Sequence, residues 1–248
     1  MIHLIIGLII GAVMGLTGAG GALVAIPLFM QLLGQSLKEA SLYSLVAVVL
    51  ASLINYVTKR SYTQYRIGIL LVIASAFGSF FTAPFKQMLP SFWIAFILSL
   101  VSIYALFNIW YPLDLKETSE KDSHQKIWSS LFVGLGLGAL TTFTGLGGGV
   151  LMFPILLGVY KLNRTQALAT SLFAVGLSSL SSLIIQVKKG ASLSIDSNFF
   201  YLVVGIIVAA FLLKKYSTLL KEHTFLKVQQ VLFTGVVVLA LVKILFLN

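Results

Sequence analysis

Cysteine is absent from the 248-residue sequence, and only 10% of its residues are charged. Because the chain has no thiol, it can form no disulfide and contains no cysteine nucleophile or cysteine ligand for a metal. The three histidines (His3, His124 and His223) lie at the terminus or in predicted connecting segments and form no cluster with metal-ligand spacing. We therefore expect neither a metal site nor a cofactor.

Acidic residues are scarce and lie in or beside predicted loops, at positions 39, 114, 117, 120, 122, 196 and 222. Cation transporters and proton pumps usually carry a carboxylate within a span, and general acid–base catalysis uses a pair of them. Neither pattern is present, so an enzyme is not expected. The remaining amides and hydroxyls suit an anion better than a cation. Glu39, at a predicted span start, is expected to cap a helix or face the surface.

Apolar residues dominate the chain, which is 58% hydrophobic with a mean hydropathy of +1.02. Predicted spans include residues 67–85, 92–111, 199–213 and 228–247. Because these runs are apolar on every side, they indicate helices and not the strands of a lipid-facing β-barrel. The sequence predicts an all-α polytopic membrane protein in contact with the lipid bilayer. The net charge of +10 falls between spans, so no nucleic acid partner is expected.

The sequence repeats itself with an offset of 127 positions, which aligns residues 7–59 with residues 134–186. The matches are mostly residues that shape the backbone, such as Gly18 with Gly145 and Pro27 with Pro154. Chance similarity between apolar helices would match Leu, Ile and Val instead. We predict two homologous membrane repeats, residues 1–111 and 127–248, joined by a hydrophilic linker at residues 112–126.

Each half begins with a Gly-interrupted apolar segment, at residues 2–33 and 128–160, followed by three longer spans. If both segments cross the membrane, the 17 Lys and Arg residues divide nine to eight between its two sides. If both segments re-enter, twelve lie on one side and five on the other. The positive-inside rule favours re-entrant segments, although long broken helices that cross stay open as an alternative. Three spans per half is an odd number, which makes the second repeat inverted. In a cell membrane the linker would then be cytoplasmic and both termini outside. The five cations on the outer side are Lys38, Lys86, Lys188, Lys189 and Lys243.

Two Gly-rich motifs interrupt these segments, Thr17-Gly18-Ala19-Gly20-Gly21 and Thr144-Gly145-Leu146-Gly147-Gly148-Gly149. Each precedes a short predicted helix, whose unpaired amides and positive end are suited to bind an anion. The structural alternative is that these glycines only permit close helix packing, as expected for Gly7, Gly11 and Gly15. Repetition at equivalent positions favours a substrate site made of Thr17, Gly18, Gly20, Gly21, Thr144, Gly145, Gly147, Gly148 and Gly149.

Three hydroxyls near the start of the following spans complete the predicted site: Ser44, Thr170 and Ser171. Lining the substrate path and hydrogen bonding between helices are equally good explanations for them. Arg164 precedes one of these spans, and its simplest role is that of a cytoplasmic loop cation.

The duplicated Gly-rich motifs, the proline after each and the run Ala167-Leu168-Ala169-Thr170-Ser171-Leu172 together resemble the TauE/SafE family of sulfite exporters and sulfonate permeases. The resemblance implies transport of sulfite, organosulfonates or related sulfur oxyanions. Ala22 and Tyr43 replace the equivalent Gly149 and Thr170, which predicts a narrower or less polar first-half site.

The expected function is alternating-access transport of a small anionic substrate. A passive anion channel is the runner-up, and a non-transporting membrane enzyme or assembly partner is the alternative from another class. Transport direction, coupling and homo-oligomer formation stay open.

Overall fold

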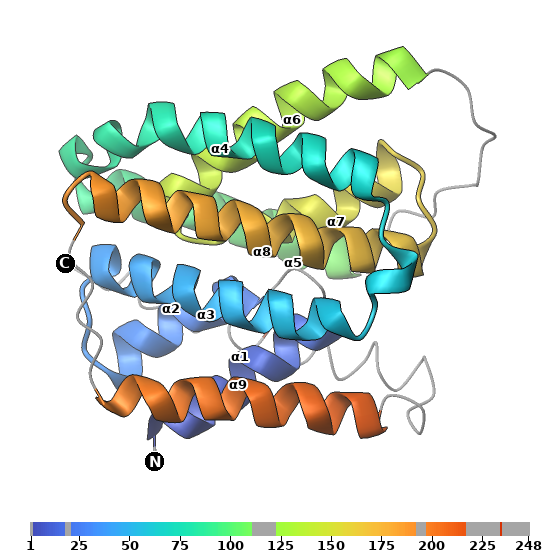
Figure 1. The fold of residues 1–248 in the computed structure, drawn as a ribbon. Helices are drawn as coiled ribbons and strands as arrows, with labels where there is room; N and C mark the ends of the chain where they lie inside the picture. Colours follow the sequence, from blue (N-terminus) through green and yellow to red (C-terminus); the bar gives the residue numbers. More distant parts are fainter. Residues whose placement is uncertain (1, 18–20, 111–122, 192–196, 217–233, 235–248) are drawn as a thin grey trace.

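The computed structural model describes residues 2–17, 21–110, 123–191, 197–216 and 234 (Figure 1). Across these ranges the chain is helical and contains no strand, which confirms the predicted fold class. The elements in chain order are α1 (Ile2–Thr17), α2 (Gly21–Leu32), α3 (Leu37–Val57), the 3-10 helix η1 (Arg60–Tyr62), α4 (Tyr65–Met88), α5 (Ser91–Trp110), α6 (Ser123–Thr144), α7 (Gly149–Gly158), α8 (Arg164–Lys188) and α9 (Ser197–Tyr216).

The predicted spans 67–85, 92–111 and 199–213 correspond to α4, α5 and α9, whereas 228–247 lies outside the described residues. Within the described part, α3, α4 and α8 are long and apolar enough to cross a membrane. Large apolar side chains also cover the outer surface, including Phe77, Phe81, Trp93 and Phe200. Such a surface suits lipid as the surrounding solvent.

Side-chain caps set the starts of the two central helices, α3 and α8. Before α3, Glu39 N donates to Ser36 Oγ (3.4 Å) and Ser36 N donates to Glu39 Oε2 (3.0 Å), which is a capping box. Before α8, Gln166 N donates to Asn163 Oδ1 (2.9 Å). Ser36 and Asn163 are separated by the same 127-residue offset that aligns the two halves. The predicted capping role of Glu39 is confirmed.

Helices α3 and α8 lie side by side in the middle of the bundle (Figure 1). A Cβ at Gly176 of α8 would be 3.3 Å from the Ser52 Cβ of α3, so the two backbones approach closely. Around them the halves exchange partners, because α1 packs along α9 and α6 packs along α4. This exchange is the pattern expected of two intertwined repeats, which stay a prediction.

Glycines allow the exchanged helices to touch backbone to backbone. A Cβ at Gly7 of α1 would be 3.1 Å from the Gly205 Cα of α9. In the other pair, a Cβ at Gly138 of α6 would collide with the Ser75 carbonyl of α4, and one at Gly78 would collide with the Leu135 carbonyl. The predicted packing role is thus observed for Gly7, since small residues allow helix backbones to approach closely in a membrane.

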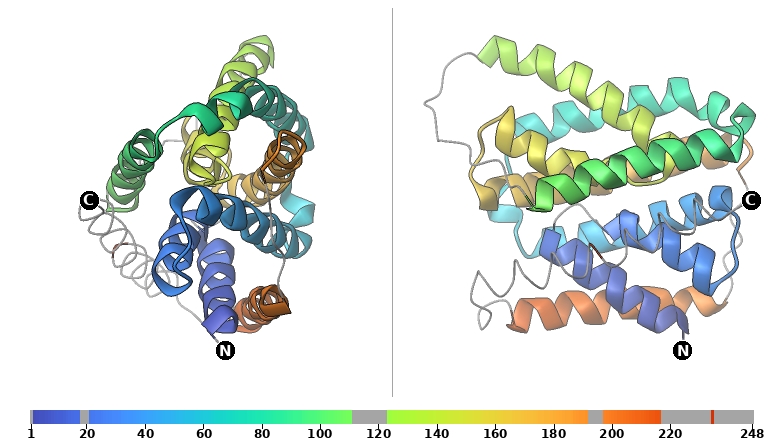
Figure 2. Two further views of the ribbon diagram at one scale, coloured as in Figure 1. Left: turned by 90° about the vertical axis from the view of Figure 1, so that its left-hand side faces the viewer. Right: turned by 180° about the vertical axis from the view of Figure 1, so that it is seen from behind.

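Helices α6 and α7 form a hairpin that returns to its starting side. Tyr160, two residues beyond α7, donates its hydroxyl proton to Ser130 Oγ near the start of α6 (2.7 Å). In Figure 1 and in the rear view of Figure 2, the start of α6 and the end of α7 lie on one side of the bundle. The start of α1 and the end of α2 lie on the opposite side. Helix α6 begins at Ser123, within the stretch 112–126 that the sequence assigns to the linker, and the bounds of the linker stay a prediction.

Replacing Gly138 with Ala tests the close helix contact. The added Cβ would collide with the Ser75 carbonyl, so α4 and α6 must separate, and we expect a loss of about 1–3 kcal/mol. Gly136→Ala is the matched control on the same helix, because its Cβ would meet no atom within 4 Å. That variant should be unchanged or up to about 1 kcal/mol more stable, since Ala favours helix. Tryptophan fluorescence during unfolding in detergent measures both, and equal stability of the two variants would contradict close packing at Gly138.

Candidate functional site

The turn between α6 and α7 is built from glycine backbone. Residues 145–148, here called the Gly loop, join Thr144 to Gly149. Gly145, Gly147 and Gly148 have φ angles of 74°, 68° and 66°. L-residues with a side chain rarely adopt this left-handed conformation, whereas glycine does so without steric penalty. The glycine run therefore shapes the turn of the hairpin.

The Gly loop is buried between the central helices α3 and α8. Ser44 Oγ of α3 donates to the Gly145 carbonyl (2.7 Å), and a Cβ at Gly145 would collide with the Ser41 carbonyl. Farther along, a Cβ at Gly147 would be 2.8 Å from Val48 Cγ1 of α3 and would collide with Ser179 Oγ of α8. At Gly145 and Gly147 there is consequently no room for a side chain, and the loop backbone faces both helices.

Several backbone amides of the Gly loop and the first turn of α7 have no hydrogen-bond partner in the described structure. Gly145 N donates to the Thr141 carbonyl (2.9 Å) and Leu146 N to Thr144 Oγ1 (3.2 Å). The next bonded amide is Met152 N, which donates to the Gly148 carbonyl (3.0 Å). The N–H groups of residues 147–151 lie between them at the positive end of α7. A helix start of this kind binds anions.

Ser179 supplies a side-chain donor beside Gly147. The residue is fully buried, and its Oγ has no hydrogen-bond partner among the described residues. Because this oxygen occupies the space next to Gly147, the hydroxyl is close to the loop backbone. Ser52, its equivalent in the first half, is also buried and unpartnered. Unpaired buried hydroxyls are uncommon, and two at equivalent positions suggest a binding role. We call the amides of residues 147–151 together with Ser179 Oγ the α7 site.

Of the predicted site residues, Ser44, Thr144, Gly145, Gly147, Gly148 and Gly149 come together at the Gly loop. Thr144 uses its hydroxyl locally: Oγ1 donates to the Leu140 carbonyl (2.6 Å) and accepts from Leu146 N. Its role here is to hold the end of α6. Thr144 therefore shapes the loop and does not offer a free donor.

The other predicted residues lie elsewhere or outside the described residues. Thr170 Oγ1 accepts a hydrogen bond from Gln64 N (2.9 Å), in the connection before α4. Ser171 is buried on α8 and donates to the Leu168 carbonyl (2.9 Å). Thr17 ends α1 and Gly21 begins α2, whereas Gly18 and Gly20 fall outside the described residues.

The buried polar side chains of the described residues are hydroxyls and amides, with the single exception of Lys86. No group of acidic, histidine or cysteine side chains within the described part could hold a metal ion. The site therefore offers donors without a buried carboxylate. The 127-residue offset pairs Ser179 with Ser52, but this match does not show whether either hydroxyl has a hydrogen-bond partner.

Comparison with known proteins gives relatives along most of the chain. "Probable membrane transporter protein YunE" of Bacillus subtilis is 26% identical over 216 residues, covering 77% of this chain and 79% of that protein. A "Probable membrane transporter protein" of Xylella fastidiosa is 23% identical over 177 residues, covering 68% and 67% of the two chains. No solved structure matches the chain.

The structure is a bundle of apolar helices around a buried turn with free hydrogen-bond donors, and its relatives are described as probable membrane transporters. Together these findings define the class of the protein as a membrane transporter. The model of the family described as "Sulfite exporter TauE/SafE" matches residues 3–244, and the chain belongs to that family.

Two serine substitutions distinguish a bonded from an unpartnered hydroxyl. Without added anion, Ser44→Ala should lose about 1–3 kcal/mol, because the buried Gly145 carbonyl loses its donor. Ser179→Ala should be unchanged or up to about 1 kcal/mol more stable, because it removes a buried hydroxyl that has no partner. Unfolding followed by tryptophan fluorescence compares the two variants. If Ser179→Ala lost as much stability as Ser44→Ala, Ser179 would have a structural partner.

Proposed function

We propose that this transporter moves a small sulfur oxyanion, such as sulfite or an organosulfonate, and that it binds at the α7 site. The observation that carries the proposal is the run of unpartnered amides at residues 147–151, with the unpartnered Ser179 hydroxyl beside Gly147. Amide and hydroxyl donors stabilise the oxygens of an oxyanion, and the helix dipole adds positive potential. Membership of the TauE/SafE family supports the sulfur oxyanion in particular.

A cation substrate fits this environment poorly. Positive ions are held by carboxylates, carbonyls or hydroxyl lone pairs, whereas the free groups at the α7 site are N–H donors and one hydroxyl. Among the described residues Glu39 is the sole acidic residue, and its carboxylate is hydrogen-bonded to Ser36 on the exposed start of α3. The charge pattern therefore favours an anion.

The arrangement of the hairpins supports alternating access. The α1–α2 and α6–α7 hairpins open toward opposite sides of the bundle, as inverted repeats would place them (Figure 1). With the positive-inside rule, the linker 112–126 would be cytoplasmic and both termini outside. A passive anion channel would use the same donors but would not concentrate its substrate.

Sulfite flux into proteoliposomes that contain the purified protein tests the proposal. We expect saturable flux that taurine, sulfoacetate, thiosulfate or sulfate inhibits in proportion to their affinity, and that a monovalent cation does not inhibit. Accumulation against a gradient would favour a secondary transporter, whereas flux that only equilibrates sulfite would favour a channel. No flux with any sulfur oxyanion, from folded protein, would contradict the substrate assignment and favour a non-transport role.

The role of Ser179 in binding gives a second test in the same flux measurement. Ser179→Ala should raise the KM for sulfite about tenfold, because one hydrogen bond to a charged ligand is lost. Ser181→Ala is the matched control on α8, since Ser181 Oγ donates to the Ser178 carbonyl of its own helix (2.8 Å). An unchanged KM in Ser179→Ala would place the substrate away from Ser179.

A further inference from the structure

Lys86 is buried inside the bundle although it is charged. It lies in the last turn of α4 and is 6% exposed. Its ammonium donates to Ser41 Oγ of α3 (2.8 Å) and to Gln186 Oε1 of α8 (2.8 Å). We call these three residues the Lys86 site. The sequence predicts a span that ends at residue 85, with Lys86 in the connecting segment beyond it. In the structure Lys86 lies within α4.

The Lys86 ammonium has no negative partner in the described structure. Both of its hydrogen bonds go to neutral oxygens, and the other buried polar side chains of the described residues are neutral. The sole described carboxylate, that of Glu39, is hydrogen-bonded to Ser36. Burying an unpaired ammonium is costly, and lysines within membrane-spanning segments usually mark a substrate or ion pathway.

A lysine near a helix end can also reach out to the membrane surface or stabilise the end of the helix dipole. The exposed fractions argue against the first explanation, since Lys188, two residues beyond Gln186 on α8, is exposed whereas Lys86 is buried. The second explanation requires no partner from other helices. Lys86 instead contacts α3 and α8, the two helices that enclose the Gly loop.

Hydrogen bonds and direct contacts connect the Lys86 site to the Gly loop. A Cβ at Gly145 would be 2.7 Å from the Cβ of Ser41, whose Oγ accepts from Lys86. On the other side, Gln186 Nε2 donates to Ser182 Oγ (3.1 Å), and Ser182 Oγ is 3.3 Å from Thr142 Oγ1 on α6. The ammonium is thus separated from the Gly loop by the single side chain of Ser41.

We propose that Lys86 is a second anion-binding site, in which the ammonium supplies the positive charge that the α7 site lacks. A lysine has three N–H donors, and the two hydrogen bonds in the structure leave one for a small oxyanion. The anion provides the missing countercharge. The aligned repeats do not duplicate the Lys86 site, because Leu168 stands opposite Ser41 and Lys59 stands opposite Gln186. This inference rests on the proposed anion function and adds the residue that recognises net charge.

Anion-dependent stability of the purified full-length chain tests the Lys86 site. Unfolding would be measured by tryptophan fluorescence with sulfite, sulfate, phosphate or chloride, each against sodium gluconate at matched ionic strength. Lys86→Met and Lys86→Gln should raise the apparent Kd of the stabilising anion about tenfold to a hundredfold, because a charged hydrogen bond is lost. Lys86→Arg, which keeps the charge, should stay closer to wild type than either. Lys188→Gln, an exposed lysine at the same end of the bundle, should be unchanged.

A measurement on wild-type protein covers the case in which the neutral variants do not fold. The bound anion should slow reductive methylation of Lys86 at least threefold and leave Lys188 unaffected, as read by mass spectrometry. Each of three results would overturn the proposal: an unchanged Kd in the neutral variants, no stabilisation by any of the four anions, or an unchanged rate of methylation at Lys86. Lys86-dependent binding without any sulfur oxyanion flux would instead retain the site and reject the proposed substrate.

Discussion

The structure depends on one constraint: backbone that leaves a helix within a membrane must be covered by protein, because hydrocarbon offers no hydrogen bonds. The Gly loop between α6 and α7 meets this constraint by packing between α3 and α8, where Ser44 donates to the Gly145 carbonyl. Glycine is required there both for its left-handed backbone and for the absence of a side chain. The amides of residues 147–151 lie in this enclosed turn without protein partners. The proposed anion site therefore follows from the way the turn is built.

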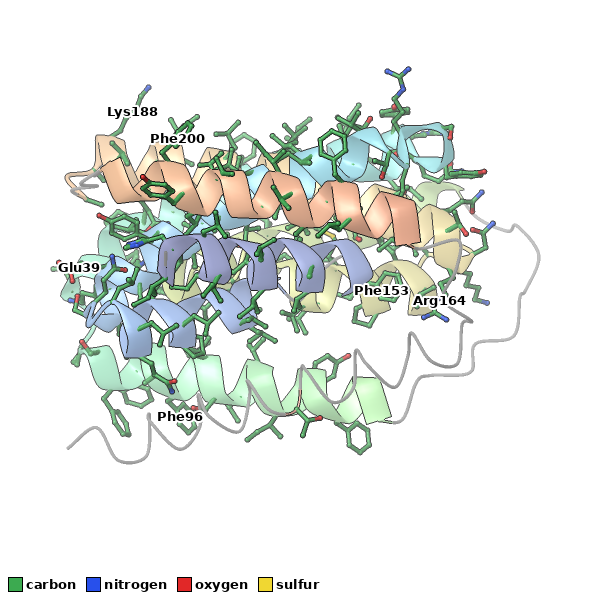
Figure 3. All side chains as sticks on the ribbon, turned by 90° about the horizontal axis from the view of Figure 1, so that it is seen from below. Glu39, Phe96, Phe153, Arg164, Lys188 and Phe200 are labelled. Carbon is green, nitrogen blue, oxygen red and sulfur yellow. The ribbon has the colours of Figure 1, made fainter. Side chains whose placement is uncertain are left out.

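The same two helices explain how charge and donors are arranged around the turn. Helices α3 and α8 contribute Ser41, Ser44, Ser179 and Gln186, which are buried side chains directed into the bundle. The view from below in Figure 3 shows Glu39, Lys188 and Arg164 near the ends of the helices. Exposed charge thus lies at the ends, while Lys86 is the one charged residue among the buried polar side chains of the described part. In a low-dielectric interior this single cation has a larger effect than the more numerous surface charges.

Much of the fold could be predicted from the sequence, because apolar runs of sufficient length leave few alternatives to helices in lipid. The Gly-rich turn was also predictable, since Gly145, Gly147 and Gly148 stand at equivalent positions to Gly18, Gly20 and Gly21. Ser44 was predicted to line the path or bond between helices, and in the structure it donates to the loop carbonyl. Thr170 was grouped with it by position in its span, but it contacts the connection before α4 instead.

Ser179 and Lys86 were missed for a physical reason. Ser179 stands in a serine-rich helix where sequence alone cannot tell which hydroxyls bond to their own backbone, as Ser181 does, and which have no partner. Lys86 falls at a predicted span end, where most lysines reach the surface. In the structure α8 packs along α4, and Lys86 reaches Ser41 of α3 and Gln186 of α8; these are tertiary contacts that no local pattern encodes.

The most direct test of the central claim is to locate a bound anion by anomalous diffraction at the selenium edge, using selenite as an analogue of sulfite. We expect a selenium peak within hydrogen-bonding reach of the amides of residues 147–151 and Ser179 Oγ. Selenite bound at saturating concentration with no peak at the start of α7 would contradict the claim.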